Sequence, residues 1–404
     1  MKHFLSTLLN RVLFLFLSKT RGLRPLKEKT GTVLLVQFAH IGDFIVWLDS
    51  ARMYRKLYPD QKITFLCRKF KSIRQLAQAT GLFDEVIEVD DGWKRRIFSV
   101  MRMTRKSFDI VINTRPTRDL QSDLYILAPR SRQRIAPASD LTCISKAWLN
   151  KSDAAYTRII PCGGIETMEL IRNAQFVRGL GAYDFLASLP VLPEFNPPKE
   201  LPHTYFAVCV GANNPANRWP PERFAKVIDA VTERYNIPCV LIGNSEEYPI
   251  GEQIRRISKH PDRLVMSQGK TTLTEYIELI RRAEFLISND TSAGHIAPAV
   301  RTPAIVIQPG WNYGRFFPYR IEREAVGLPV SVAAAIDCVG CGRDPTVDGS
   351  KSCLNGGVMK CILSVTPEDV IQRCVFQIKQ EGDRHEFQGD TQKKTPGNFQ
   401  RGGI

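Results

Sequence analysis

Short apolar runs alternate along the first half of the chain with segments that carry apolar residues at helical spacing. The continuous run Thr32–Phe38 (TVLLVQF) is typical of a buried parallel strand. Further strands are predicted over residues 62–67, 86–89 and 108–113, and helices over about 43–57 and 73–80. Strands that alternate with helices indicate a doubly wound parallel sheet.

A proline-rich stretch, Leu192–His203, interrupts this alternation and predicts an interdomain linker. The alternation then restarts. Strands are predicted over residues 205–210, 238–242, 285–288 and 304–307, and helices over 221–235, 246–258, 273–282 and 367–379. We therefore expect an α/β protein with two Rossmann-like domains, residues 31–192 and 205–380, joined by a linker at 193–204. The polar tail 381–404 is predicted to be disordered.

The N-terminal segment, residues 1–30, is apolar at helical spacing from Phe4 to Phe16 and basic around that stretch. Its apolar run is shorter than the roughly 20 residues that a membrane-spanning helix needs. Asn10 and Arg11 interrupt what would be a signal-peptide core. We predict a helix lying on an anionic membrane surface. A helix packed on the protein's own surface and a cleaved signal remain alternatives.

Composition narrows the class of protein without deciding the function. A chain of 404 residues suits two domains, and 43% hydrophobic residues excludes global disorder. The formal net charge of +15 suggests a polyanionic partner, which fits nucleic acid, an anionic membrane or a phosphorylated substrate equally well. Six of the ten cysteines are scattered, which favours a reducing compartment.

Ligands of such sheets bind at the carboxyl ends of the strands, so the loops after Phe38, Val210 and Ser288 are candidates. The strongest signal is the turn that follows Ser288 and opens a helix. Small residues there let backbone N–H groups approach a phosphate, and the helix N-terminus favours negative charge. The residues of this phosphate-binding turn are Asp290, Thr291, Ser292, Ala293, Gly294 and His295. An ordinary capped turn is the alternative.

The other two loops carry weaker signals. Gly42 permits close backbone approach, and Asp43 is either a general base that faces the cleft or a helix N-cap. Gly211 shapes the loop after the first strand of the second domain, and Arg218 in that loop could neutralise a diphosphate or be a plain surface arginine. Neither half has G-x-G-x-x-G at its first turn, which disfavours a dinucleotide site.

Taken together, these segments resemble glycosyltransferase family 9, the heptosyltransferase family of lipopolysaccharide assembly. The resemblance covers roughly residues 31–378. It is carried by VLLVQFAHIGDFIV, NRWPPERFAKVI, VLIGNSEE, LISNDTSAGHIAPAV and TPAIVIQPG.

The resemblance implies a GT-B fold and an inverting, metal-independent transfer from a nucleotide sugar, typically an ADP-heptose. It implies no cofactor for catalysis. It places the catalytic base at Asp43 and the donor diphosphate at residues 290–295. It offers Glu246 and Glu247 as alternative contacts of the nucleoside ribose. The lysine that the family usually has two residues before its Trp-Pro pair is Asn217 here, with Arg218 adjacent, so either Arg218 takes over its charge or the donor is held differently.

A cysteine cluster precedes the last predicted helix. Its members are Cys338, Cys341, Cys353 and Cys361. A CxxC pair followed by two more cysteines is compatible with a structural zinc site, although the second pair has an unusual spacing. Disulfides and free buried thiols are the alternatives.

From these features we expect an enzyme that moves a sugar, with a heptose as the favoured one, to a lipopolysaccharide-core or related glycan acceptor. We expect it in the cytoplasm, on the inner face of the cytoplasmic membrane. A phosphorylated acceptor would meet basic residues of the first domain, namely Arg68, Lys69, Lys71, Arg95, Arg96, Arg115 and Arg118. The alternatives are another nucleotide sugar, a protein acceptor, a nucleotide-sugar 2-epimerase and a nucleic-acid-binding protein. No recognition-helix motif supports the last, so no nucleic acid is expected.

Overall fold

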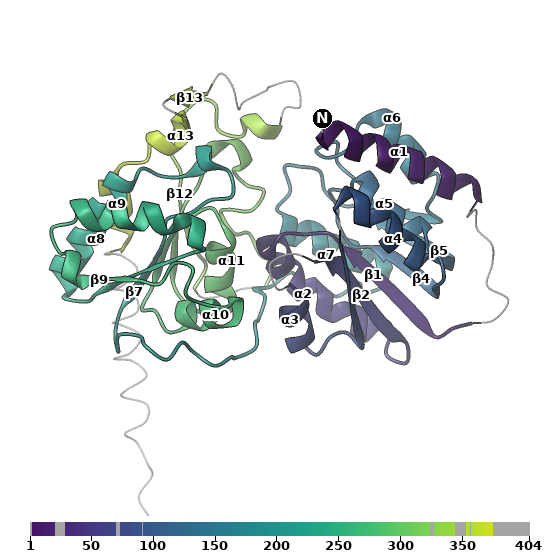
Figure 1. The fold of residues 1–404 in the computed structure, drawn as a ribbon, viewed down its shortest axis with the longest axis horizontal. Coiled ribbons are helices and arrows are strands. Elements are labelled where there is room, and N and C mark those ends of the chain that lie inside the picture. The colour runs from purple at the N-terminus through teal and green to yellow at the C-terminus, as the bar shows by residue number, and fades with distance from the viewer. Residues whose placement is uncertain are drawn as a thin grey trace, which may run out of the picture.

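The structure, a computed structural model, describes residues 2–20, 29–69, 73–90, 92–323, 327–343, 353–355 and 357–374. Two parallel six-stranded sheets with helices on their faces lie side by side (Figure 1). The predicted α/β class with two Rossmann-like domains is confirmed. Residues 193–204 contain no helix or strand, and the predicted disordered tail lies outside the described residues.

The first sheet has the strand order β3-β2-β1-β4-β5-β6. Its strands are β1 (Thr32–Gln37), β2 (Lys62–Arg68), β3 (Glu85–Val89), β4 (Ser107–Asn113), β5 (Arg130–Pro137) and β6 (Arg158–Ile160). Val33 of β1 lies between Ile63 of β2 and Ile110 of β4. The helices of this half are α2 (Ile41–Leu57), α3 (Ile73–Ala79), α4 (Trp93–Met103), α5 (Leu120–Leu127), α6 (Lys146–Asp153) and α7 (Glu169–Leu180).

The second sheet has the order β12-β11-β10-β7-β8-β9. Its strands are β7 (Phe206–Cys209), β8 (Cys239–Ile242), β9 (Leu264–Met266), β10 (Leu286–Asn289), β11 (Ala304–Ile307) and β12 (Val330–Val332). The main helices of this half are α8 (Pro221–Tyr235), α9 (Tyr248–Ile257), α10 (Leu273–Arg281) and α11 (Ser292–Ala299). A hairpin of β13 (Leu354–Asn355) and β14 (Val358–Met359) leads into the short helix α13 (Lys360–Leu363), and residues 367–374 are helical.

The apolar pattern identified the central strands but missed β5 and β6 of the first sheet and β9 and β12 of the second. Strand β5 reads RSRQRIAP, which is too rich in arginine to be identified from hydrophobicity. Its buried Arg134 is accommodated because its Nε donates to the Ser131 hydroxyl at 3.2 Å. The strands β6, β9 and β12 are only three residues long. Short strands at the edges of a sheet need little apolar surface.

The two halves share part of their hydrophobic core. One buried cluster contains Trp47 of α2, Leu286 of β10 and Ile296 of α11. Helix α2 packs directly against α11 across the boundary between the halves. Because apolar burial stabilises by about 25 cal/mol per Å², this shared cluster favours an arrangement in which the two halves are in contact.

The N-terminal helix α1 (Lys2–Thr20) packs on the first half through Phe14 and Leu17, which are almost fully buried. Phe14 makes an edge-on contact with Trp148, with ring centroids 6.2 Å apart. Among the described residues no helix is both long and apolar enough to cross a membrane. The packing agrees with the alternative of a helix on the protein's own surface, although much of α1 remains exposed.

Candidate functional site

The site lies where both sheets reverse their strand order, between β1 and β4 and between β10 and β7. Loops at such a switch point leave a crevice at the carboxyl ends of the strands. The loops after β1, β7 and β10 are the three that the sequence singled out. The same rule also selects the loop after β4, which the sequence interpretation passed over.

The loop after β1 and the loop after β10 meet across the boundary between the halves. A methyl group added to Gly42 would lie 2.9 Å from Cδ2 of His295 and 3.6 Å from Cα of Ser292. Burial dominates the pKa of both Asp290 and His295, and Asp43 lies near enough for its negative charge to act on both groups as well. The predicted base and the predicted phosphate-binding turn therefore share one site.

Asp43 has a structural contact of its own. It is the third residue of α2, and its Oδ2 accepts a hydrogen bond from the His40 backbone N–H at 3.1 Å. This contact is part of a capping box in which His40 is the N-cap, so the interpretation of Asp43 as the N-cap itself is wrong, although its carboxylate does help to cap the helix from the third position. The carboxylate is only half-buried and also lines a pocket, so a role as base is compatible with the same position.

The turn after β10 is built around the start of α11. Thr291 is the N-cap, and its hydroxyl accepts the Ala293 N–H at 3.2 Å. Gly294 is required for packing, because an added methyl group would lie 3.0 Å from Val306 and 3.1 Å from Phe317. Burial raises the pKa of Asp290 to about 6, although the Asn312 amide donates to its carboxylate at 2.7 Å.

His295 faces the first half from the first turn of α11. Its ring stacks on Phe317 at 4.5 Å, and its Nδ1 lies 2.9 Å from the Tyr319 hydroxyl. Burial lowers its pKa to about 4, so the imidazole is neutral near pH 7. In the tautomer whose Nδ1 accepts from Tyr319, the ring proton lies on Nε2, on the side toward Gly42.

The structure separates the two acidic candidates that the sequence left together. Glu247 is buried, and its carboxylate lies over Gly211 and Gly243, where an added methyl group would clash with it. It accepts hydrogen bonds from the Asn244 backbone N–H at 3.0 Å and side-chain amide at 3.2 Å. Glu246 is exposed. Only Glu247 lies at the carboxyl ends of β7 and β8.

Arg218 lies in the loop after β7, half-buried, with its Nε donating to the Ala212 carbonyl at 3.1 Å. Asn217 is buried, and its side-chain oxygen accepts from the Trp311 ring N–H at 3.3 Å. A lysine at position 217 would lose that contact. The structure thus gives Asn217 a packing role and leaves Arg218 as the cation of this loop.

A pocket next to Asp43 has about 360 Å³ of empty volume and is lined from both halves. Its lining residues are Gln37, Asp43, Val46, Thr114, Arg115, Pro116, Thr117, Glu169, Asn173 and Arg315. Apart from Asp43 and Arg115, the sequence interpretation named none of these. Residues 114–117 follow β4 and could have been found from the switch-point rule. Glu169, Asn173 and Arg315 carry no motif.

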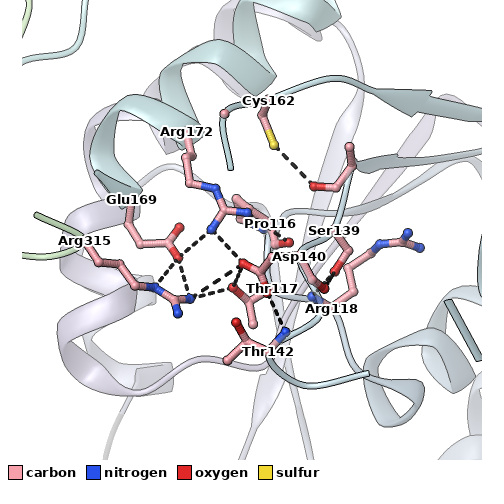
Figure 2. A network of polar contacts seen from close by, with 12 residues as sticks. Pro116, Thr117, Arg118, Ser139, Asp140, Thr142, Cys162, Glu169, Arg172 and Arg315 are labelled. Carbon is pink, nitrogen blue, oxygen red and sulfur yellow. Dashed lines mark hydrogen bonds and ion pairs between the residues drawn. The ribbon is translucent and has the colours of Figure 1, made fainter. Parts of the chain in front are cut away.

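Arg315 ties the two halves together beside this pocket (Figure 2). Its Nη2 donates to Glu169 Oε1 at 2.9 Å and to the Thr117 hydroxyl at 2.7 Å. The buried Arg172 also donates to Glu169, at 3.1 Å, and to Asp140 at 2.9 Å. Each charge in this network has an opposite partner, which offsets the cost of burying it.

Two of the seven basic residues expected to receive a phosphorylated acceptor cannot do so as predicted. Arg118 is fully buried and bound to Asp153 and Ser152, and Arg96 is buried against Ser6 and Asn10. Of the other five, only Arg115 lines the pocket. Arg68 lies over the Phe38 ring at 5.1 Å, and Arg95 pairs with Asp90. Lys69 is exposed, and Lys71 lies outside the described residues.

The four predicted cysteines lie near one another. The backbone N–H of Cys341 donates to the Cys338 carbonyl at 3.1 Å, which forms a tight turn. Burial, followed by the nearby Cys338, Cys353 and Cys361, raises the pKa of the Cys341 thiol. All ten cysteines are free. Among the described residues no three or more His, Cys, Asp or Glu side chains are arranged to hold a metal ion, so the zinc site stays a prediction.

The chain resembles known glycosyltransferases in part of its sequence and in its fold. Residues 186–336 match the family model of glycosyltransferase family 9 (heptosyltransferase). A curated relative, lipooligosaccharide heptosyltransferase 2 of Haemophilus influenzae, is 30% identical over 171 residues, which are 41% of this chain and 44% of the relative. The chain thus aligns with less than half the length of that relative.

Solved structures resemble the whole fold. A glycosyl transferase family 9 protein from Veillonella parvula superimposes with a TM-score of 0.65 at 17% identity, covering 88% of this chain and 99% of its own. ADP-heptose lps heptosyltransferase II of E. coli gives a TM-score of 0.63 at 16% identity, covering 87% and 99%. The fold is GT-B, and residues 186–336 are similar to glycosyltransferase family 9. The resemblance drawn from the sequence is confirmed.

The buried neutral His295 predicts a pH dependence of stability. Its pKa falls from 6.5 in the unfolded chain to about 4 in the folded protein, so only the unfolded chain takes up a proton between these values. Stability therefore falls as the pH drops from about 6.5 to about 4, by about 3 kcal/mol from this residue. Denaturant unfolding should show this loss diminished in His295→Gln.

The exposed His203 supplies the control, since His203→Gln should leave the pH profile of the wild type unchanged. The buried Asp123 and Asp290, whose pKa values are both raised to about 6, act in the opposite direction. They remain in every variant, so their effect largely cancels in the comparison. Identical pH profiles for wild type and His295→Gln would contradict the neutral buried imidazole.

Proposed function

We propose that this chain, which is similar to glycosyltransferase family 9, transfers a heptose from ADP-heptose to a lipopolysaccharide-core or related glycan acceptor. The observation that carries the proposal is the contact between Gly42 and His295, which places Asp43 beside the turn at Asp290. A transferase needs a base for the acceptor and a cradle for the donor phosphates at one site.

The donor diphosphate would lie at the start of α11. Backbone N–H groups of residues 292–294 and the partial positive charge of the helix favour an anion there, and the Thr291 and Ser292 hydroxyls add donors. Arg218 would contribute a full positive charge from the loop after β7. His295 would donate from Nε2. Glu247 would accept the ribose hydroxyls at the ends of β7 and β8.

The reaction would be a single displacement. Asp43 removes the proton from the acceptor hydroxyl, and the hydroxyl oxygen forms a bond to the anomeric carbon of the donor. The bond from that carbon to the diphosphate oxygen breaks on the opposite side, so the configuration inverts. We propose that the helix N-terminus and Arg218 balance the charge of the leaving nucleoside diphosphate without a metal ion.

The acceptor would enter the pocket beside Asp43. Arg115, from the loop after β4, is only partly buried and lines this pocket, where it would meet a phosphate or carboxylate of the acceptor. Arg315 and Glu169 would position the acceptor by holding the two halves together. A lipid-linked acceptor implies work in the cytoplasm, at the inner face of the cytoplasmic membrane.

Replacing Asp43 by asparagine separates its two roles. The side-chain amide oxygen of asparagine can accept the His40 N–H as the carboxylate does, so the unfolding free energy should change by no more than about 0.5 kcal/mol. Asparagine does not take up a proton, so transfer should fall by about 100-fold or more. Release of ADP from the nucleotide sugar in the presence of acceptor measures this. The exposed Asp60→Asn serves as the control. A stable Asp43→Asn variant with wild-type turnover would place the base elsewhere.

The two neighbouring glutamates offer a matched pair for the donor site. Glu247→Gln should weaken binding of the nucleotide sugar by about tenfold, because a buried charged acceptor is replaced by a neutral amide. The exposed Glu246→Gln should change affinity less than about twofold. Titration calorimetry with the nucleotide sugar measures both. Weaker binding in Glu246→Gln alone would contradict the assignment.

We also propose that the four clustered cysteines hold a structural metal ion. Four thiolates suit zinc or iron, and the tight turn between Cys338 and Cys341 is the geometry that a metal knuckle needs. The purified protein should contain about one such ion per chain, and Cys341→Ser should lose it. The exposed Cys143→Ser in the first half should retain it.

Elemental analysis by mass spectrometry reads out which metal is bound without assuming one. If the native protein contains no metal, a thiol reagent tells the remaining states apart. Modification of all four cysteines after unfolding without a reductant would show that they are free thiols. An absence of both metal and reactive thiols would indicate disulfides. Either result would contradict the metal proposal.

A further inference from the structure

Helix α1 has apolar residues on two opposite sides. One side carries Phe14 and Leu17 into the core of the first half. The opposite side is exposed, and at 100° per residue its large apolar residues all fall within one face of the helix. They are Leu5, Leu8, Val12, Leu15 and Phe16, with 41% to 61% of their surface exposed.

Helix α4 lies next to α1 and exposes two further large apolar residues. The two helices are fixed side by side, because Nη1 of the buried Arg96 donates to the Ser6 hydroxyl at 3.1 Å and to Asn10 Oδ1 at 2.5 Å. Phe98 and Met101 of α4 are 75% and 57% exposed. We call the seven exposed apolar residues of α1 and α4 the docking face. Soluble proteins rarely expose as many large apolar residues on one helix face as α1 does.

The charged residues of α1 and α4, the two helices that carry the docking face, are all basic. Neither α1 nor α4 contains an aspartate or glutamate. Arg11 and Lys19 of α1 are exposed, and so are Lys94, Arg95 and Arg102 of α4. Arg105 follows directly after α4 and is exposed as well. Arg95 pairs with Asp90 at 2.7 Å.

We propose that the docking face inserts into the headgroup region of an anionic lipid bilayer. Apolar side chains on one helix face with basic residues beside them are the pattern of a helix that lies in a membrane interface. The apolar residues enter the acyl boundary, while the cations stay at the level of the lipid phosphates. A protein partner would need acidic groups to match the same cations.

Docking through this face would orient the first half toward a lipid-linked acceptor. Helix α1 packs on α5, and Tyr125 of α5 contacts Phe38 edge-on, with ring centroids 5.0 Å apart. Phe38 precedes the loop that carries Asp43. In Figure 1 the N-terminal end of α1 points toward the second half of the molecule. The inference deepens the proposed function and rests on it only for the lipid-linked nature of the acceptor.

Sedimentation of the full chain with vesicles tests the proposal. The wild type should bind vesicles of phosphatidylcholine with added phosphatidylglycerol, and it should bind pure phosphatidylcholine weakly. Combined Leu8→Ser, Val12→Ser and Phe16→Ser should lower the affinity for anionic vesicles by at least about tenfold, because the apolar insertion is lost. Combined Arg102→Glu and Arg105→Glu should weaken binding similarly and reduce its salt dependence.

Two matched controls lie away from the docking face. Tyr183→Ser removes a side chain that is 81% exposed, and Arg256→Glu reverses an exposed charge on α9. Both should bind vesicles like the wild type. Thermal unfolding checks that every variant is folded, and the charge pair still tests the face if the triple variant does not fold.

Three results would overturn the proposal: wild-type binding by both the triple and the charge variant, equal binding of the wild type to both kinds of vesicle, or no binding. A wild type that is dimeric without lipid and a triple variant that is monomeric would assign the face to self-association instead. The vesicles contain neither donor nor acceptor, so this outcome is independent of transfer. Loss of transfer with intact vesicle binding would contradict the proposed function alone.

Discussion

The contact between α2 and α11 is the interaction on which the site depends. Glycine at position 42 lets the first turn of α2 approach the His295 ring, and no larger residue fits without displacing it. The contact continues into the shared core of Trp47, Leu286 and Ile296. Apolar packing thereby determines where a carboxylate from one Rossmann-like half meets the helix N-terminus of the other.

Polar contacts between the two halves supplement this apolar packing. Arg315 reaches from the second half to Glu169 and Thr117 of the first, in the wall of the pocket that Asp43 also lines. Burial holds His295 neutral and raises the pKa of Asp290 to about 6, so Asp290 still carries most of its negative charge near pH 7. An anionic diphosphate there would depend on the positive end of α11 and on Arg218.

Much of the fold could be predicted because both halves place apolar strands at their centres, and Pro221–Tyr235 and Ala304–Ile307 begin and end as expected. The arginine-rich β5 and the short edge strands lacked that signal. The turn at 290–295 was visible from its small residues, but Arg315 and Glu169 were not, because each acts through a partner about 146 positions away in the chain. The sequence of charged residues does not show which of them are buried. Only the structure shows that Glu247 rather than Glu246 faces the site, and that Arg118 and Arg96 are buried.

A crystal structure of the protein with a nucleotide sugar bound is the most direct test of the account. It should show the diphosphate within hydrogen-bonding distance of the backbone N–H groups at the start of α11, with the anomeric carbon directed toward Asp43. A nucleotide bound away from α11, or a sugar directed away from Asp43, would contradict the assignment of this site.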